Sequence, residues 1–231
     1  MGLDPKVENP LPFPLWLRIG FWICLAISIA VVLRRLLALA RTSQSPPSPM
    51  AGLDQSFATH TALTLAHILP ALLFVVLAPV IVFRRPPRPS WINAAFYSLG
   101  IIVAVTAYAM SAYSIGGWIE RLAVFFFDTF FLISLVRAWH HRRRDNSALA
   151  HRWELRSIAI LLGIATTRPV MGVFFATSRA THLLPQQFFG IAFWIGFSIN
   201  VLVFELWVRS LDRLNRARHA QGITPHLRRA L

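Results

Sequence analysis

Six long apolar segments dominate this chain of 231 residues. A helix needs about 20 residues to cross roughly 30 Å of hydrocarbon at about 1.5 Å per residue, and each segment approaches or exceeds that length. The segments lack the strict alternation of a membrane β-barrel, so their backbone groups must be hydrogen-bonded within helices. The predicted spans are residues 14–37, 58–83, 91–114, 117–139, 154–177 and 187–208. The sequence therefore predicts an all-α, polytopic helical membrane bundle, with residues 1–231 forming a single integral membrane domain.

The basic residues follow the predicted spans. The formal net charge is +14, although 56% of the residues are hydrophobic. The arginines cluster at Arg84–Arg88, at Arg137–Arg144 and from Arg209 onward, each time directly after an apolar segment. This placement is typical of membrane-protein loops, so a nucleic-acid partner is not expected. Arginine bias places both termini and the loops after the second and fourth spans in the cytoplasm, with residues 209–231 as a basic cytoplasmic tail.

Two features of the first span complicate this assignment. Arg34, Arg35 and Arg41 fall at its predicted outer end, against the charge bias. The small residues Ala38–Ala40 also resemble a signal-peptidase site, but two arginines interrupt the approach to them, so the segment is interpreted as a span. Cys24 is the only cysteine, which excludes an intramolecular disulfide and a cysteine metal cluster.

Three ionisable residues are predicted near the middle of the membrane. They are His67 on the second span, Asp128 on the fourth and Arg168 on the fifth, each about 14 to 16 Å from the outer end of its span. An isolated arginine at that depth costs about 2.5 to 3.5 kcal/mol, so a partner is expected. The hypothesis is that Arg168 pairs with Asp128, with His67 close by. The pair is either a structural ion pair or part of a site for a ligand or a proton.

Two further sets of polar residues are candidates for the same centre. His60, Thr64 and His67 are four and seven residues apart and therefore share one helical face. Asn200 lies deep on the sixth span, where hydrogen bonding between helices is the expected role. The polar centre predicted from the sequence thus comprises His60, Thr64, His67, Asp128, Arg168 and Asn200.

Two stretches carry a resemblance to a known family. One runs from His67 to Pro79 and is followed by Arg84 and Arg85. The other runs from His151 to Arg168, in which the following residues fall in register: Trp153, Arg156, Ser157, Thr166 and Arg168. Over residues 58–177 the chain resembles the bacterial multi-pass membrane proteins of domain of unknown function 2306. Glu154 stands where that family usually has methionine. The resemblance implies a helical domain in the bacterial inner (plasma) membrane with recurrent His and Arg positions, and it implies no established activity.

Two functional interpretations follow from the sequence. In the first, the protein lies in the lipid bilayer and its polar interior binds a small lipophilic or ionic ligand, carries a proton, or is structural. In the second, it is a b-type haem redox protein whose axial ligands come from His60, His67 and His182. No HExxH, nucleophile-elbow or phosphate-binding glycine motif is present, so an enzyme is not favoured. The sequence determines neither the ligand nor the oligomeric state.

Overall fold

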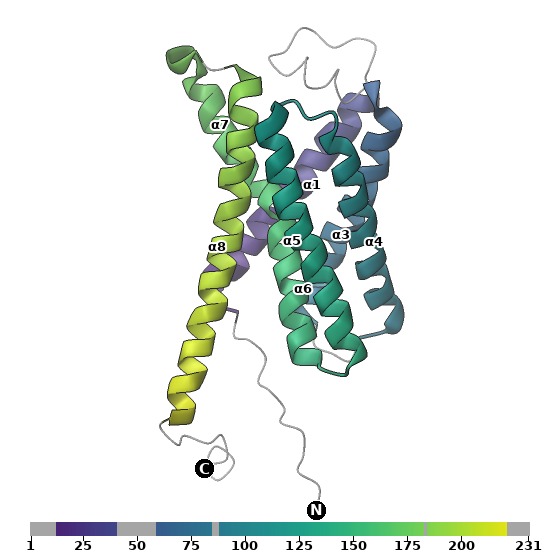
Figure 1. Ribbon diagram of the computed structural model, residues 1–231, viewed down its shortest axis with the longest axis vertical. Helices are drawn as coiled ribbons and strands as arrows, with labels where there is room; N and C mark the ends of the chain where they lie inside the picture. Colours follow the sequence, from purple (N-terminus) through teal and green to yellow (C-terminus); the bar gives the residue numbers. More distant parts are fainter. Residues whose placement is uncertain (1–12, 41–58, 85–87, 183, 221–231) are drawn as a thin grey trace, which may run out of the picture.

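The described part of the chain is almost entirely helical. The computed structural model describes residues 13–40, 59–84, 88–182 and 184–220, and within them it contains helices and no strands. The helices are α1 (Leu15–Ala40), α3 (Thr61–Phe83), α4 (Ser90–Ser111), α5 (Gly117–Arg143), α6 (Ser147–Leu161), α7 (Gly163–Thr181) and α8 (Pro185–Ala220). They run roughly along one axis and form an elongated bundle (Figure 1). The predicted all-α class is therefore confirmed.

Among the residues that the structure describes, five helical segments are long and apolar enough to cross a membrane. They are α1, α3, α4, the run Ser147–Ser178 through α6 and α7, and Gln186–Leu214 within α8. These segments support a multi-pass membrane protein. The helix α5 occupies the predicted fourth span but is not among the five, and it carries Glu120, Arg121, Asp128 and Arg137 along its length. Six crossings and cytoplasmic termini therefore stay predictions.

The fifth predicted span is two helices in the structure. The helix α6 begins at Ser147, seven residues earlier than predicted, because the Asn146 side chain accepts a hydrogen bond from the Leu149 N–H at 3.2 Å and caps the helix. The chain then breaks at Leu162, where the Ala165 N–H bonds three residues back, at 3.0 Å, instead of four. The predicted fifth span therefore consists of two consecutive helices, and the run Ser147–Ser178 through both is long and apolar enough to cross a membrane.

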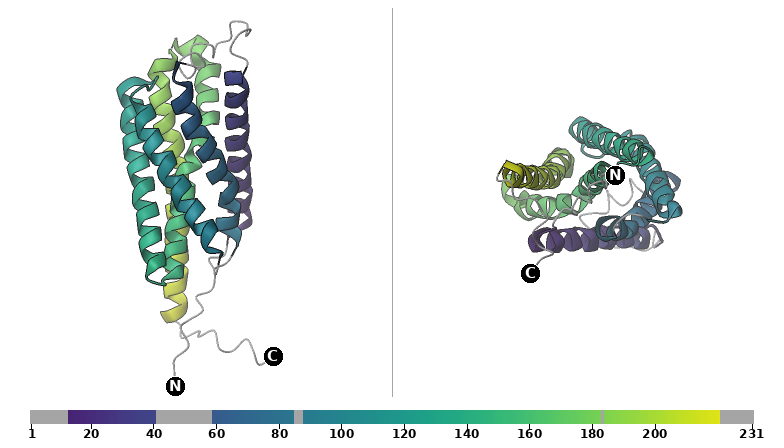
Figure 2. Two further views of the ribbon diagram at one scale, coloured as in Figure 1. Left: turned by 90° about the vertical axis from the view of Figure 1, so that its right-hand side faces the viewer. Right: turned by 90° about the horizontal axis from the view of Figure 1, so that it is seen from below.

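The bundle has two distinct ends. The connections from α3 to α4 and from α5 to α6 lie at one end, where α1 begins and α8 extends farthest (Figure 1). We call this the basic end, because it carries the predicted arginine clusters, and we call the other the opposite end. The end-on view of Figure 2 shows α7 and α8 on one side and α3, α4 and α5 on the other.

The break at Leu162 changes which helices surround the chain. Towards the basic end, α6 packs against α3, α5 and α8. Towards the opposite end, α7 packs against α1, α8 and α6, and within the described part of the chain it has no contact with α3, α4 or α5. The interior of the bundle is therefore occupied by α6 at the basic end and bordered by α7 at the opposite end.

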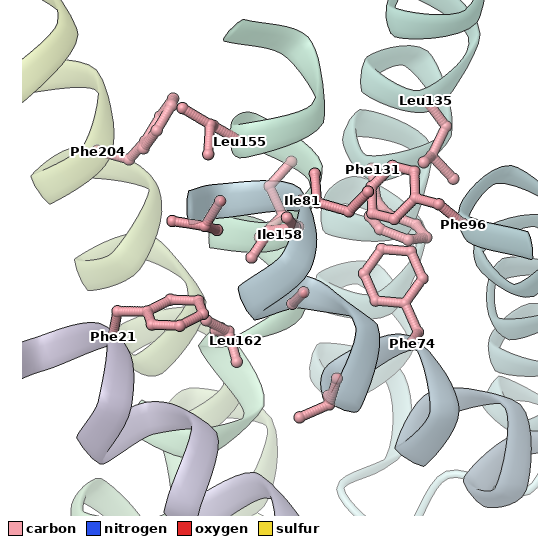
Figure 3. Packing of buried hydrophobic residues seen from close by; sticks show 14 of the residues in the cluster. Phe21, Phe74, Ile81, Phe96, Phe131, Leu135, Leu155, Ile158, Leu162 and Phe204 are labelled. Carbon is pink, nitrogen blue, oxygen red and sulfur yellow. The ribbon is translucent and has the colours of Figure 1, made fainter. Parts of the chain in front are cut away.

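Aromatic and aliphatic side chains fill the core around α3 and α6. Phe74 stacks on Phe96 with ring centroids 4.7 Å apart and meets Phe131 edge-on at 5.8 Å (Figure 3). Ile81 and Ile158 are almost completely buried beside them. This packing joins α3, α4, α5 and α6 into one unit by close contact, as expected for helices in lipid.

A close backbone approach holds α7 against α8. A Cβ atom at Gly196 would lie 2.4 Å from the Thr167 Oγ1 atom and 2.6 Å from the Thr167 Cα atom. Only glycine therefore fits at this crossing. The contact fixes the segment of α7 that carries Arg168.

Candidate functional site

The predicted pair between Arg168 and Asp128 does not form. Among the residues that the structure describes, no ion pair with an N–O distance of 4.0 Å or less joins them. The Asp128 Oδ2 atom is buried and has no hydrogen-bond partner. The physical reason is the break at Leu162: α7 packs on α8 and α1, whereas α5 packs on α4, α6 and α8. Equal depth along two helices was therefore not sufficient to bring the side chains together.

Arg168 instead lies within electrostatic range of other charged residues. Its guanidinium is influenced electrostatically by Arg35 and Arg34 on α1 and by Glu120 on α5. Among the described residues, its hydrogen bond runs from Nη1 to the sulfur of Met171 at 3.9 Å, and its buried Nε atom has no partner there. A thioether is a weak acceptor, so this contact does little to compensate the charge.

Glu120 is an acid of the described residues whose charge acts on Arg168. Its side chain is buried, and its Oε2 atom accepts a hydrogen bond from the Gly116 N–H at 2.6 Å. Gly190 on α8 lies directly beside it, because a Cβ atom there would be 2.7 Å from the Glu120 nitrogen. The carboxylate is therefore held at the start of α5, and Arg168 interacts with it at longer range than an ion pair.

His67 contacts α4 and not Arg168. Its Nδ1 atom lies 2.9 Å from the Thr106 hydroxyl, and that hydroxyl donates its proton to the Ile102 carbonyl at 2.6 Å. When the hydroxyl gives its one proton to that carbonyl, Nδ1 of His67 is the donor to the hydroxyl oxygen. Thr64, one turn away, is buried on the same helix. These residues join α3 to α4.

The remaining predicted residues have separate surroundings. Asn200 accepts a hydrogen bond from the Thr166 hydroxyl at 2.7 Å and donates to the Ala159 carbonyl at 3.3 Å, so it joins α8 to α6 and α7. The ring of His60 packs against the Tyr113 ring at a tilt of 31°, with centroids 3.8 Å apart.

His182 is the third histidine of the haem hypothesis, and it ends α7 in the left-handed conformation with φ 53°. It is exposed, whereas His60 precedes and His67 lies on α3, a helix that α7 does not contact in the described part of the chain. Within that part, no three His, Cys, Asp or Glu side chains are grouped so that they could hold a metal ion.

The most strongly connected polar group is one that the sequence analysis did not select. Glu154 on α6 is completely buried, and its carboxylate pairs with Arg88 and Arg142, each at 2.5 Å. It also accepts a hydrogen bond from the Tyr97 hydroxyl at 2.9 Å and lies 3.5 Å from the His151 ring.

Arg88 and Arg142 are also held by the surrounding chain. Arg88 donates to the Ile81 carbonyl at 3.0 Å, so α3 is tied to the same group. Burial alone would lower the pKa of Arg142, but the Glu154 carboxylate outweighs burial and raises it above its ordinary value. The group therefore connects α3, α4, α5 and α6 at the basic end.

A signal for this group was present in the sequence. The basic clusters at Arg84–Arg88 and Arg137–Arg144 were placed at the same end of the bundle, and Glu154 begins the predicted span that starts there. An acid next to two arginine clusters is the natural counter-charge for both. Its burial depends on α6 entering the interior, which the sequence pattern did not indicate.

Comparison with models of protein families, with curated proteins and with solved structures finds no match. The resemblance to domain of unknown function 2306 therefore stays a prediction.

Proposed function

We propose that this chain is a multi-pass protein of the bacterial inner membrane that binds a small amphiphilic anion through Arg168. The observation that carries the proposal is the incomplete compensation of this guanidinium. Arg168 lies 13 residues, or about 20 Å, from the end of α7, and its Nε atom is buried without a partner. A carboxylate or phosphate would supply the acceptors that the chain does not.

The local charge favours an anion over a cation or a neutral ligand. Arg34 and Arg35 act on Arg168 as like charges, and among the described residues Glu120 acts on it in the opposite direction. A cation at membrane depth needs compensation, because charges cannot be solvated by hydrocarbon. An anionic group bound at Arg168 would compensate its guanidinium.

The helix packing allows such a ligand to approach. In the described part of the chain, α7 is packed by α1, α8 and α6 alone. A lipophilic molecule that reached Arg168 from the side of α3, α4 and α5 would therefore separate no closely packed pair of helices. An acyl or aromatic body would be compatible with the apolar residues of these segments.

The proposal is tested with purified full-length protein in detergent, using palmitate and dodecyl phosphate as probes. The wild type should bind one or both, and Arg168→Gln should weaken binding by roughly tenfold, as loss of a charge-assisted hydrogen bond predicts. Arg168→Lys, which keeps the charge, should retain part of the affinity. Arg213→Gln, an exposed arginine on α8, should bind the probes like the wild type.

Two results would contradict the proposal. Unchanged probe binding by Arg168→Gln would remove Arg168 from the site. A wild type that binds neither probe, together with a large loss of stability in Arg168→Gln, would make the arginine structural. An absorption spectrum of the same preparation tests the haem alternative, for which we expect no Soret band, because the three candidate histidines lie apart.

A further inference from the structure

Two arginines lie over one tryptophan at the basic end, and their charges are compensated differently. The guanidinium carbons of Arg156 and Arg137 are 4.3 Å and 5.0 Å from the centroid of the Trp153 ring. Arg156 is paired with Glu205 through Nε and Nη2, the latter at 2.9 Å from Oε2. Trp153 thus contacts two arginines, of which Arg156 is paired with a carboxylate and Arg137 is not.

Arg137 is the uncompensated one. Among the described residues, no carboxylate pairs with Arg137 and no acceptor receives a hydrogen bond from it; its contact is with the aromatic ring of Trp153. The neighbouring acids are already engaged, since Glu205 holds Arg156 and Asp212 pairs with Arg152. A guanidinium fixed over a ring keeps its planar edge available for an anion.

The position of Arg137 along α5 matches the surface of a bilayer. It lies 20 residues after Gly117, the first residue of the helix, which corresponds to about 30 Å, the thickness of the hydrocarbon core. If α5 crosses the membrane, its guanidinium lies at the level of the lipid headgroups. Trp153, which contacts Arg137, then lies at the same membrane–water interface, where tryptophan is common.

The face of α5 that leads to Arg137 is apolar and exposed. Ile133 is four residues before Arg137, and Phe126 is seven residues before Ile133, so the three residues share one side of the helix. Phe126 is 57% exposed and Ile133 is 45% exposed. An acyl chain lying along these residues would place its headgroup beside Arg137.

We propose that Arg137 and Trp153 form a binding site for the phosphate of an anionic phospholipid, whose acyl chain lies along Ile133 and Phe126. The apolar stripe formed by Ile133 and Phe126 favours a lipid over free phosphate, because a soluble anion has no acyl chain to pack against these residues. The site should prefer an anionic lipid to a zwitterionic one. The basic end carries many further arginines, which attract a headgroup with a net negative charge. This site is independent of the proposed site at Arg168.

The test is native mass spectrometry of the full-length protein after exchange into detergent with phosphatidylglycerol or phosphatidylcholine. The wild type should retain phosphatidylglycerol preferentially. Arg137→Gln should reduce the retained fraction by roughly tenfold. Trp153→Leu, which leaves the charge unchanged, should reduce it by about two- to fivefold because the guanidinium is no longer held. Arg213→Gln, an exposed arginine on α8, is the matched control and should behave like the wild type.

Three outcomes would overturn the assignment. Equal losses in Arg137→Gln and Arg213→Gln would show attraction by net charge and no site. Equal retention of the two lipids would remove the preference for an anionic headgroup. Displacement of phosphatidylglycerol by an equal concentration of inorganic phosphate would show that the apolar stripe contributes nothing. None of these three measurements depends on whether Arg168 binds palmitate. The lipid site at Arg137 and the anion site at Arg168 can therefore be refuted independently.

Discussion

Arg88 and Glu154 form an ion pair at 2.5 Å in which both side chains are completely buried, although 66 residues separate them in the chain. The pair joins the start of α4 to α6 and is completed by Arg142 and Tyr97. Each charge was removed from water on folding, so the arrangement is stable only while every member is present. The polar residues with the largest structural role thus lie at the basic end.

Removal of the Glu154 charge is expected to destabilise the bundle strongly. In Glu154→Gln, Arg88 and Arg142 lose their carboxylate while the shape of the side chain is kept, which should cost about 3–5 kcal/mol. Thermal and denaturant unfolding in detergent, followed by helical circular dichroism, measures the change. Glu205→Gln is the matched control, because its pair with Arg156 is partly exposed and should contribute about 1 kcal/mol or less. Similar losses in the two variants would contradict the account.

The substitutions Arg168→Ala and Asp128→Ala are expected to act independently. Because no ion pair joins these residues, the loss in the double variant should equal the sum of the single losses within about 0.5 kcal/mol. The same unfolding assay provides the measurement. A double variant much more stable than that sum would mean that the two charges interact after all.

The crossing of α7 and α8 should not tolerate a methyl group. Gly196→Ala would place a carbon within 3 Å of the Thr167 backbone, so the helices must separate, at a cost of about 1–3 kcal/mol. Gly172→Ala on α7 is the control, because nothing lies within 4 Å of its added Cβ atom. That variant should be neutral or slightly stabilised, since alanine is the better helix former. Equal losses of stability in the two variants would contradict this description of the packing.

Whether α5 crosses the membrane is decided by labelling its two ends. In a Cys24→Ser background, Ala112→Cys lies just before α5 and Ser147→Cys just after it, and both positions are exposed. We expect an impermeant maleimide to label Ala112→Cys in intact cells and Ser147→Cys only after permeabilisation, as the arginine bias predicts. Labelling of both positions from one side would reduce the number of crossings and would also withdraw the lipid site at Arg137.

The role of Asn200 was predicted from the sequence. Asn200 was expected to join helices, and it bonds both Thr166 and the Ala159 carbonyl. The pairing of Arg156 with Glu205 on α8 was not predicted. The role of Asn200 depended on its depth alone, whereas the partner of Arg156 depends on which helices are neighbours.

The helical class and the apolar segments followed from the sequence alone, because length, hydrophobicity and the absence of alternation are properties of consecutive residues. Contacts between segments were decided by the tertiary structure. The break at Leu162 directs α6 into the interior and α7 towards α1 and α8, which buries Glu154 between two arginines and separates Arg168 from Asp128. Depth along a helix fixes only one coordinate of a side chain, and the packing of the helices fixes the other two.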